Sequence, residues 1–304
     1  MKKIFILFVL LSQFSFSQDL NQTINSVSKA WSNKNYSVVI TYCNEFLTYE
    51  KKNHIATDSN SLTIRVYLAK AYFNTEQYQK AIDISLTSLK TTKSFFGETE
   101  VIYAVFLNEI RDCYLVLKEF NKSIGINKEA LEIYERIYGK KHTEYVNSLY
   151  RLALIYTTTQ NYQNSIPCYI ELLKLIKTLY GVNHIYYYTV LNNMALDHDR
   201  LGNYNKALES YLEVLKIIGE NVGKEHPDYA LTLENVAFTY SNLGNYNKAL
   251  GLYLEVLKFK EKILGKQNTG YAGTLGNVAL AYSGLGNYNK ALELNLETLK
   301  IKEK

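Results

Sequence analysis

The chain has 304 residues, with 28 Tyr, 2 Pro and 3 Cys, and its formal net charge is +5. Hydrophobic residues make up 47% and charged residues 21%, so the composition excludes intrinsic disorder and collagen-like sequence. Three Cys are too few, and odd in number, for a disulfide scaffold. The small net charge on so long a chain gives no electrostatic footprint for nucleic acid.

The segment 1–17 has the pattern of a secretory signal peptide. Two Lys precede an apolar run at residues 4–11, and the small residues Ser15 and Ser17 stand where a signal peptidase reads. The run is too short to span a bilayer, although a membrane-anchoring or buried N-terminal helix is the alternative. We therefore expect an exported protein, periplasmic or extracellular, with residues 18–304 as the mature part and no membrane span after removal of the signal.

The mature chain repeats itself at a fixed interval. The string LGNYNKAL begins at Leu201, Leu243 and Leu285, and this spacing sets the repeat period. The Tyr of this string belongs to a series of seven aromatic residues that follow one another at the same interval. They are Tyr36, Tyr78, Phe120, Tyr162, Tyr204, Tyr246 and Tyr288. A second series consists of Gly97, Gly139, Gly181, Gly223 and Gly265. A period of this length is typical of solenoids and other repeat arrays.

Each repeat unit is predicted to hold two helices joined by a short turn. In the sixth unit, residues 228–243 and then residues 246–264 carry apolar side chains at the three- and four-residue spacing of a helix. Pro227 stands where a helix starts and Gly265 where one ends. No strand-like alternation of useful length appears in the mature chain, so the predicted fold class is all-α.

Helix pairs of this kind bury their apolar faces only by stacking on neighbouring pairs. We therefore expect residues 18–304 to form one α-solenoid of about seven helix-turn-helix units, in place of the two domains that length alone would suggest. The units are expected near residues 20–55, 56–97, 98–139, 140–181, 182–223, 224–265 and 266–304.

The repeat resembles the tetratricopeptide repeat (TPR). The pattern L-(A)-x-x-Y-x-x-x-G-x-Y-x-x-A is matched in the sixth unit by Val236, Ala237, Tyr240, Gly244, Tyr246 and Ala249. The 42-residue length, with GKEHP at residues 223–227 and LNNMA at residues 191–195, is similar to the repeats of kinesin light chains and their bacterial relatives. HEAT-like repeats are the alternative of similar length, but they lack the Gly-x-Tyr-x-x-Ala turn.

The resemblance covers residues from about 20 to 304 and is weaker in the first three units. In the third unit Arg111 stands where the other units have a small residue, which leaves the helix packing of that unit open. The resemblance implies a right-handed superhelix whose concave groove is lined by the first helix of each unit. It also implies a non-catalytic scaffold for protein–protein interaction, which binds a peptide or protein segment in that groove.

Two ladders on the first helices are the candidate groove residues. The apolar ladder consists of Leu154, Leu196, Phe238 and Leu280, and the amide ladder of Asn193, Asn235 and Asn277. Tyr150, Asn192 and Glu234 each precede a residue of the apolar ladder by one helical turn and therefore lie on the same faces of these helices. An Asn amide both donates and accepts hydrogen bonds, as an extended peptide backbone requires. The alternative is that these Asn residues only bridge neighbouring helices.

The charged residues expected in the groove have both signs, and they are Lys70, Asp112, Asp199, Arg200 and Glu234. A groove with charges of both signs argues against an acidic polymer as ligand and against binding by electrostatic attraction alone. A short, moderately apolar peptide or protein tail fits this mixture better.

No sequence pattern indicates catalysis, a cofactor or a metal site. Three His are in register, at His142, His184 and His226. Residues one repeat apart are on the order of 10 Å apart, so they cannot converge on one ion, and we interpret them as linker residues. The Cys residues read as buried thiols, and one bridge between Cys113 and Cys168 of adjacent units stays open.

Two functions remain open. The chain is either a complete interaction scaffold or the N-terminal sensory or substrate-binding part of a larger signalling protein or CHAT-type peptidase, as in bacterial proteins with similar repeats. The second hypothesis is motivated by residues 299–304, which end in or just after the last second helix without the polar capping helix that solenoids normally need. Self-association through this uncapped C-terminal unit is a further expectation.

Overall fold

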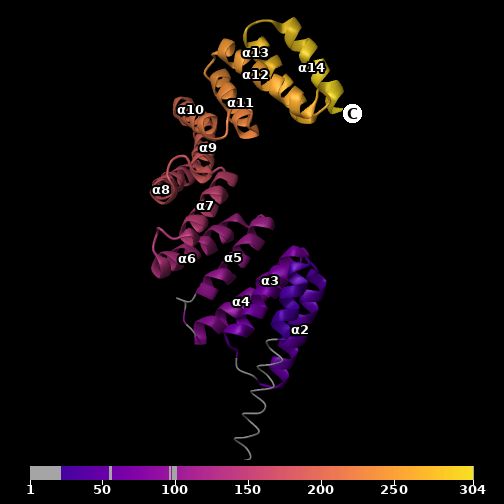
Figure 1. Cartoon of the computed structure of the whole chain (residues 1–304), viewed down its shortest axis with the longest axis vertical. Helices are drawn as coiled ribbons and strands as arrows, with labels where there is room; N and C mark the ends of the chain where they lie inside the picture. Colours follow the sequence, from indigo (N-terminus) through magenta and orange to yellow (C-terminus); the bar gives the residue numbers. More distant parts are fainter. Residues whose placement is uncertain (1–21, 55–56, 96, 98–100, 304) are drawn as a thin grey trace, which may run out of the picture. The chain divides into compact units, whose positions relative to one another are not determined.

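The computed structural model describes residues 22–54, 57–95, 97 and 101–303, and this part of the chain consists of helices and turns without a strand (Figure 1). Residues 22–32 are helical. The helices that follow are α2 (Tyr36–Lys52), α3 (Ser59–Asn74), α4 (Tyr78–Phe95), α5 (Val101–Val116), α6 (Phe120–Tyr138), α7 (Thr143–Thr158), α8 (Tyr162–Tyr180), α9 (Ile185–Arg200), α10 (Tyr204–Asn221), α11 (Pro227–Asn242), α12 (Tyr246–Leu264), α13 (Thr269–Gly284) and α14 (Tyr288–Lys302). The predicted signal peptide lies outside the described residues.

The helices alternate as the first and second helix of each repeat, as the period predicts. In the sixth unit the second helix has the predicted bounds, and the first helix begins and ends one residue earlier than predicted. Pro227 occupies the first turn of α11, and Gly265 ends α12 with its N–H donating to the carbonyl of Glu261 at 3.0 Å. The prediction of an all-α solenoid is confirmed.

The chain divides into two compact units, residues 1–155 and 156–304, and each has its own apolar core. In the N-terminal unit one core cluster joins the helical segment 22–32 to α2 and α3 through Val27, Cys43 and Leu68. In the C-terminal unit the Tyr of the second helix, Tyr211 or Tyr253, is buried among small and branched residues of the neighbouring helices. The Tyr that recurs at this position is therefore a packing residue.

The turn between the two helices of a pair needs a left-handed residue in every unit. Gly fills this position in the last three units, with φ of 76°, 73° and 80° at Gly202, Gly244 and Gly286. The first four units place Lys34, Glu76, Lys118 and Gln160 there, with φ of 56° to 60°. The turn geometry is thus kept even where a side chain makes the left-handed conformation costly.

The His residues that recur once per repeat cap the first helices. The imidazole Nδ1 of His142, His184 and His226 accepts the backbone N–H two residues later, at 3.3, 3.2 and 3.2 Å. Asn268 replaces His in the last unit, and its Oδ1 accepts the N–H of Gly270 at 2.7 Å. The predicted linker residues therefore have a defined role as N-caps, since they satisfy a backbone donor that the helix leaves unpaired.

Candidate functional site

Two pockets lie on the faces of first helices that the sequence predicts as groove, one in each compact unit. The first, named here the Phe238 pocket, has a volume of about 500 Å³ and is lined by Leu196, Asp199, Arg200, Tyr211, Glu234, Asn235, Phe238, Lys260, Gly270, Gly273 and Asn277. The second, the Glu109 pocket, has a volume of about 520 Å³ and is lined by Asn108, Glu109, Arg111, Asp112, Tyr134, Glu144, Asn147, Ser148, Tyr150, Arg151 and Leu154.

The Phe238 pocket brings together seven of the predicted groove residues, Leu196, Asp199, Arg200, Glu234, Asn235, Phe238 and Asn277. They come from α9, α11 and α13, the first helices of three successive repeats. The ring of Phe238 is 39% exposed, so it offers apolar surface to a ligand. Sequence reasoning missed Tyr211 and Lys260, because they reach the pocket from second helices, which it did not treat as groove-lining.

A hydrogen-bond network occupies one side of the Phe238 pocket. The carboxylate of Glu234 accepts from Lys260 Nζ at 2.7 Å, from Thr274 Oγ1 at 2.6 Å and from Asn277 Nδ2 at 3.4 Å. These residues lie on three helices, so the network also joins neighbouring repeats. Glu234 and Asn277 are therefore partly engaged within the protein. The side chain of Asn235 has no hydrogen bond within the described part of the chain and keeps its full capacity for a ligand.

The remaining predicted residues of this unit lie apart from the Phe238 pocket. Asn192 and Asn193 are half-buried on α9, and the Oδ1 atom of Asn192 is buried without a hydrogen-bond partner among the described residues. Leu280 lies on α13 and is 52% exposed. Each ladder therefore contributes only two residues to the pocket: Leu196 and Phe238 from the apolar ladder, and Asn235 and Asn277 from the amide ladder.

Two buried carboxyl groups of α9 connect this helix to the repeats before and after it. Asp197 accepts hydrogen bonds from Thr157 Oγ1 at 2.7 Å and from Ser165 Oγ. Asp199, which lines the Phe238 pocket, accepts from Thr239 Oγ1 at 3.2 Å. Burial raises the pKa of both carboxyl groups above the usual value, and these hydrogen bonds oppose the rise.

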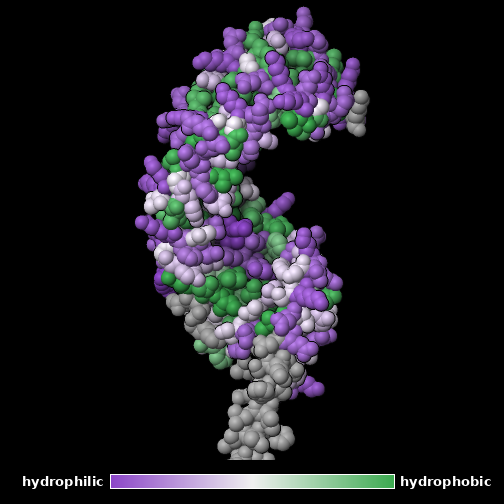
Figure 2. All heavy atoms as spheres, in the orientation of Figure 1, coloured by the Kyte–Doolittle hydropathy of each residue, from purple (hydrophilic) through white to green (hydrophobic). Residues whose placement is uncertain are grey.

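The Glu109 pocket contains three predicted groove residues: Asp112 on α5, and Tyr150 and Leu154, which are half-buried on α7. Its other lining residues are mostly charged or polar, and Figure 2 shows strongly hydrophilic side chains gathered over part of α5. Sequence reasoning placed Asp112 in the groove but did not single out Glu109 or Arg151. Both could have been found, because they stand one repeat apart at the ladder position of Asn193.

Arg111, whose packing the sequence left open, is buried at the edge of the Glu109 pocket, and its Nε and Nη1 atoms have hydrogen-bond partners. Its guanidinium donates to Asn108 Oδ1 at 2.5 Å, to Asn127 Oδ1 at 3.1 Å and to Asp112 Oδ1 at 2.9 Å. Asn127 stands where units four to six have the buried Tyr of the second helix, whereas the seventh unit has Asn295 there. Relative to units four to six, the third unit exchanges a small residue for Arg and a large Tyr for Asn, and the two changes fill one space together.

The carboxylate of Glu109 is the charge in the Glu109 pocket that neighbouring cations neutralise least. Burial raises the pKa of its carboxyl group from the ordinary value of 4.5 to about 7, while Lys70 opposes the rise and Asp112 adds to it. Lys70 Nζ lies 3.8 Å from the Glu109 carboxylate, which is too long for a hydrogen bond. A carboxyl group in this setting changes its charge near neutral pH.

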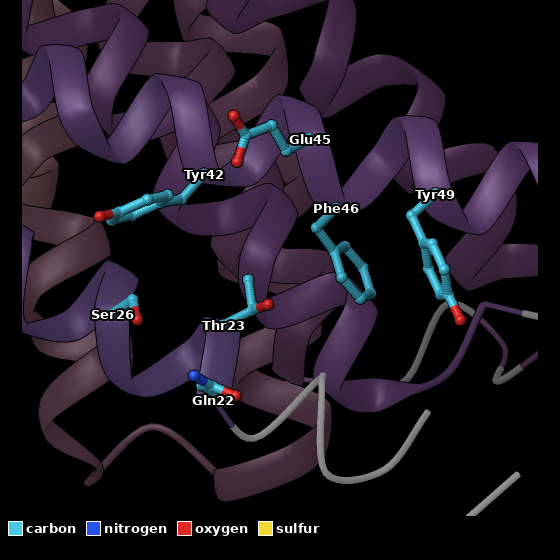
Figure 3. Close-up of a pocket in the computed structure, with 7 residues that line it drawn as sticks. All are labelled: Gln22, Thr23, Ser26, Tyr42, Glu45, Phe46 and Tyr49. Carbon is cyan, nitrogen blue, oxygen red and sulfur yellow. The ribbon is translucent and has the colours of Figure 1, made fainter. Parts of the chain in front are cut away.

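A third pocket, shown in Figure 3, lies outside the predicted groove. It has a volume of about 340 Å³ and is bounded by the helical segment 22–32 and by α2, from which Tyr42, Glu45, Phe46 and Tyr49 line it. These residues belong to a second helix, and the pocket includes Gln22, where the described part of the chain begins. We therefore do not assign the ligand site to it.

The described residues contain no group of three His, Cys, Asp or Glu side chains that could hold a metal ion. All three Cys are free thiols, and Cys168 is half-buried where the sequence predicted burial. Burial raises the pKa of Cys43 and of Cys113 to about 12, so both thiols stay protonated and unreactive. Across the described part of the chain, no helix is both long enough and apolar enough to pass through a membrane.

The model of the tetratricopeptide repeat family matches residues 144–220, 186–262 and 228–304. These overlapping matches extend from residue 144 to residue 304, more than half of the chain. None of the curated proteins matches the sequence.

Several solved structures share the fold at low sequence identity. The TPR-like repeats of a protein described as a kinesin light chain from Podospora anserina are 18% identical, with a TM-score of 0.57 over 64% of this chain and 93% of that chain. BtubC (BKLC) from P. vanneervenii is 16% identical, with a TM-score of 0.59 over 80% of this chain and 91% of that chain. A signal transduction ATPase of the STAND class with a tetratricopeptide repeat sensor, from Pyrococcus horikoshii, is 16% identical, with a TM-score of 0.68 over 94% of this chain and 41% of that chain.

Proposed function

The chain belongs to the tetratricopeptide repeat family, and on that premise we propose that it is a non-catalytic scaffold that binds a peptide or protein segment along its first helices. The observation that carries the proposal is the Phe238 pocket. It combines an exposed aromatic ring, an apolar neighbour in Leu196 and the uncommitted amide of Asn235. Apolar surface with a few convergent polar groups is the usual make-up of a binding site.

The pocket suits an uncharged stretch of extended peptide. Asn235 can donate to one backbone carbonyl and accept from one backbone N–H, while Phe238 and Leu196 contact an apolar side chain. The charges of Glu234 and Lys260 compensate each other at 2.7 Å, so they contribute little attraction to a charged ligand. Affinity would come from several repeats that act together.

The proposal is tested with short random peptides displayed on phage and selected on the full chain. Selected peptides are synthesised, and their affinities for variants are measured by titration calorimetry. We expect Asn235→Ala to weaken binding about five- to tenfold, the worth of one or two hydrogen bonds. Phe238→Ala should weaken it by at least as much, because the truncation removes exposed apolar contact area.

Asn247→Ala is the matched control, since Asn247 is exposed on the second helix α12 and lies outside the pocket. It should bind the selected peptides with unchanged affinity. The proposal would be contradicted if both pocket variants kept wild-type affinity while circular dichroism reported an intact helical fold.

A second candidate function is that the chain is the sensory part of a larger signalling protein. The STAND protein with a repeat sensor supports this at the level of the fold, because 94% of this chain aligns with part of that longer protein. The coding sequence after Lys304 separates the two candidates. A stop codon directly after Lys304 would contradict the sensory role in a larger chain.

We also propose self-association through α14 and export of the protein. Tyr288, Leu292, Leu296 and Leu299 are each at least half exposed on α14, which supports self-association. Light scattering should then report an oligomer that Leu296→Lys dissociates, and a monomeric wild-type chain would contradict it. Export rests on the pattern of residues 1–17, and mass spectrometry of envelope protein beginning at Gln18 would test it.

A further inference from the structure

The two ladders of the first helices change their chemistry in the N-terminal unit. The position held by Asn193, Asn235 and Asn277 is Glu109 in the third unit and Arg151 in the fourth. The apolar position held by Leu196 and Phe238 is Asp112 in the third unit. The face that is amide and apolar in later repeats is therefore charged here, and the Glu109 pocket is formed by these charged substitutes.

The charges around the Glu109 pocket leave one carboxylate undercompensated. Asp112 is paired with the guanidinium of Arg111 at 2.9 Å, and Arg151 approaches it at 3.7 Å. Within the described part of the chain, the ion-pair partner of Glu109 is Lys70 at 3.8 Å, and the Lys70 side chain is 40% exposed, so water competes for its charge. Desolvation outweighs the attraction of Lys70, Arg111 and Arg151 on the Glu109 carboxyl group. The missing partner is a cation.

The other oxygen-bearing groups of the pocket point to the same ligand chemistry. Ser148 lines the pocket, is only 3% exposed, and has a hydroxyl group with no hydrogen-bond partner in the described part of the chain. Glu144 adds carboxylate oxygens from α7, and Tyr134 adds a hydroxyl from α6, which accepts from Asn108 Nδ2 at 2.7 Å. Oxygen atoms thus line the space from α5, α6 and α7, while the guanidinium of Arg111 is held by three partners and that of Arg151 lies 3.7 Å from Asp112.

We propose that the Glu109 pocket receives a basic side chain, Lys or Arg, of the bound segment, with the Glu109 carboxylate as its counter-ion. This deepens the proposed function and rests on it. A guanidinium or ammonium group carries donors and no acceptor, which matches the lining oxygens. A hydrogen bond between ionised partners is about twice as strong as a neutral one, and exclusion of water strengthens it further.

The test uses three small probes on the full chain: the N-acetyl amides of arginine, of its neutral isostere citrulline and of glutamate. Binding is followed through the backbone amide resonances of α5 and α7. We expect the arginine probe to bind about tenfold more tightly at pH 8 than at pH 6, because the Glu109 carboxyl group ionises in between. The citrulline probe should bind weakly at both pH values.

Glu109→Gln keeps the shape of the side chain and removes its charge. It should abolish both the preference for arginine over citrulline and the pH dependence, while Glu135→Gln, an exposed control on α6, should keep both. Tighter binding of the glutamate probe, or an unchanged arginine preference in Glu109→Gln, would overturn the proposal. If selected peptides respond to Asn235→Ala but the arginine probe does not respond to Glu109→Gln, the basic pocket fails while the peptide-binding function stands.

Discussion

At the scale of single residues, the His that recurs in the repeat acts as a helix N-cap through one acceptor atom, Nδ1. His226 caps α11 through Nδ1, and Asn268 caps α13 through Oδ1, because both atoms can accept the N–H two residues later. His and Asn are therefore interchangeable here, although they differ in size and ring character. The in-register series is explained by capping and needs no shared ligand.

We predict that His226→Ala lowers the free energy of unfolding by about 1 kcal/mol, the usual cost of losing an N-cap. His226→Asn should keep most of that stability, because Asn268 performs the same capping in the next repeat. Urea unfolding followed by circular dichroism measures both variants. Equal stability of the Ala variant and the wild type would contradict the capping role.

At the scale of secondary-structure elements, the third repeat keeps its helix packing by a paired exchange. Units four to six have Ala and Tyr at the two positions, for example Ala153 with Tyr169. The third unit has Arg111 and Asn127 instead, joined at 3.1 Å, and Asn127 Nδ2 also donates to the carbonyl of Ser148 at 3.0 Å. The pair thereby connects α5, α6 and α7.

We predict strong coupling between these two positions. Arg111→Ala should cost about 2–4 kcal/mol, since it leaves a cavity and unpaired buried amides. Asn127→Tyr alone should also destabilise, because the larger ring meets Arg111. The double variant restores the pair found in units four to six and should recover at least about 1 kcal/mol of the summed losses. A double-mutant cycle of urea unfolding measures this, and additive losses would contradict the exchange.

The repeat period predicted the helices and their turns because these depend on local signals, such as Pro227, Gly265 and the recurrent aromatic. It could not predict that Asn277 and Lys260 share the carboxylate of Glu234, since that contact joins residues on three different helices. The joint substitution at Arg111 and Asn127 could have been predicted from the sequence. Both residues differ from those of units four to six, and a comparison of the third unit with these three would have paired them.

At the scale of the whole molecule, stability depends on pH through a few buried groups in both compact units. Burial raises the pKa of Glu109, Asp197 and Asp199, so the folded chain holds protons that the unfolded chain releases. Their contribution to stability is lost as pH rises through the raised values. His198 has the opposite effect on the pH dependence of stability, because burial lowers its pKa. Its contribution to stability is lost as pH falls below the ordinary pKa of 6.5.

The contribution of Glu109 can be isolated by comparing the wild type with Glu109→Gln, which does not titrate. Below pH 4.5 the Glu109 carboxyl group is protonated in both the folded and the unfolded chain, and above about pH 7 it is ionised in both. Between these values the free energy of unfolding of the wild type should fall relative to the variant, by about 3 kcal/mol in total. Urea unfolding at several pH values across this window measures the difference.

Parallel stability curves for the two chains would contradict the raised pKa of Glu109. A falling difference would mean that the chain carries a destabilising buried carboxylate at neutral pH, which Gln at the same position avoids. A neutral residue would serve the fold better, as Asn235 does at the corresponding position of a later repeat. A carboxylate that costs stability at neutral pH is what the proposed binding role requires, because only the charged carboxylate can act as counter-ion for a basic side chain.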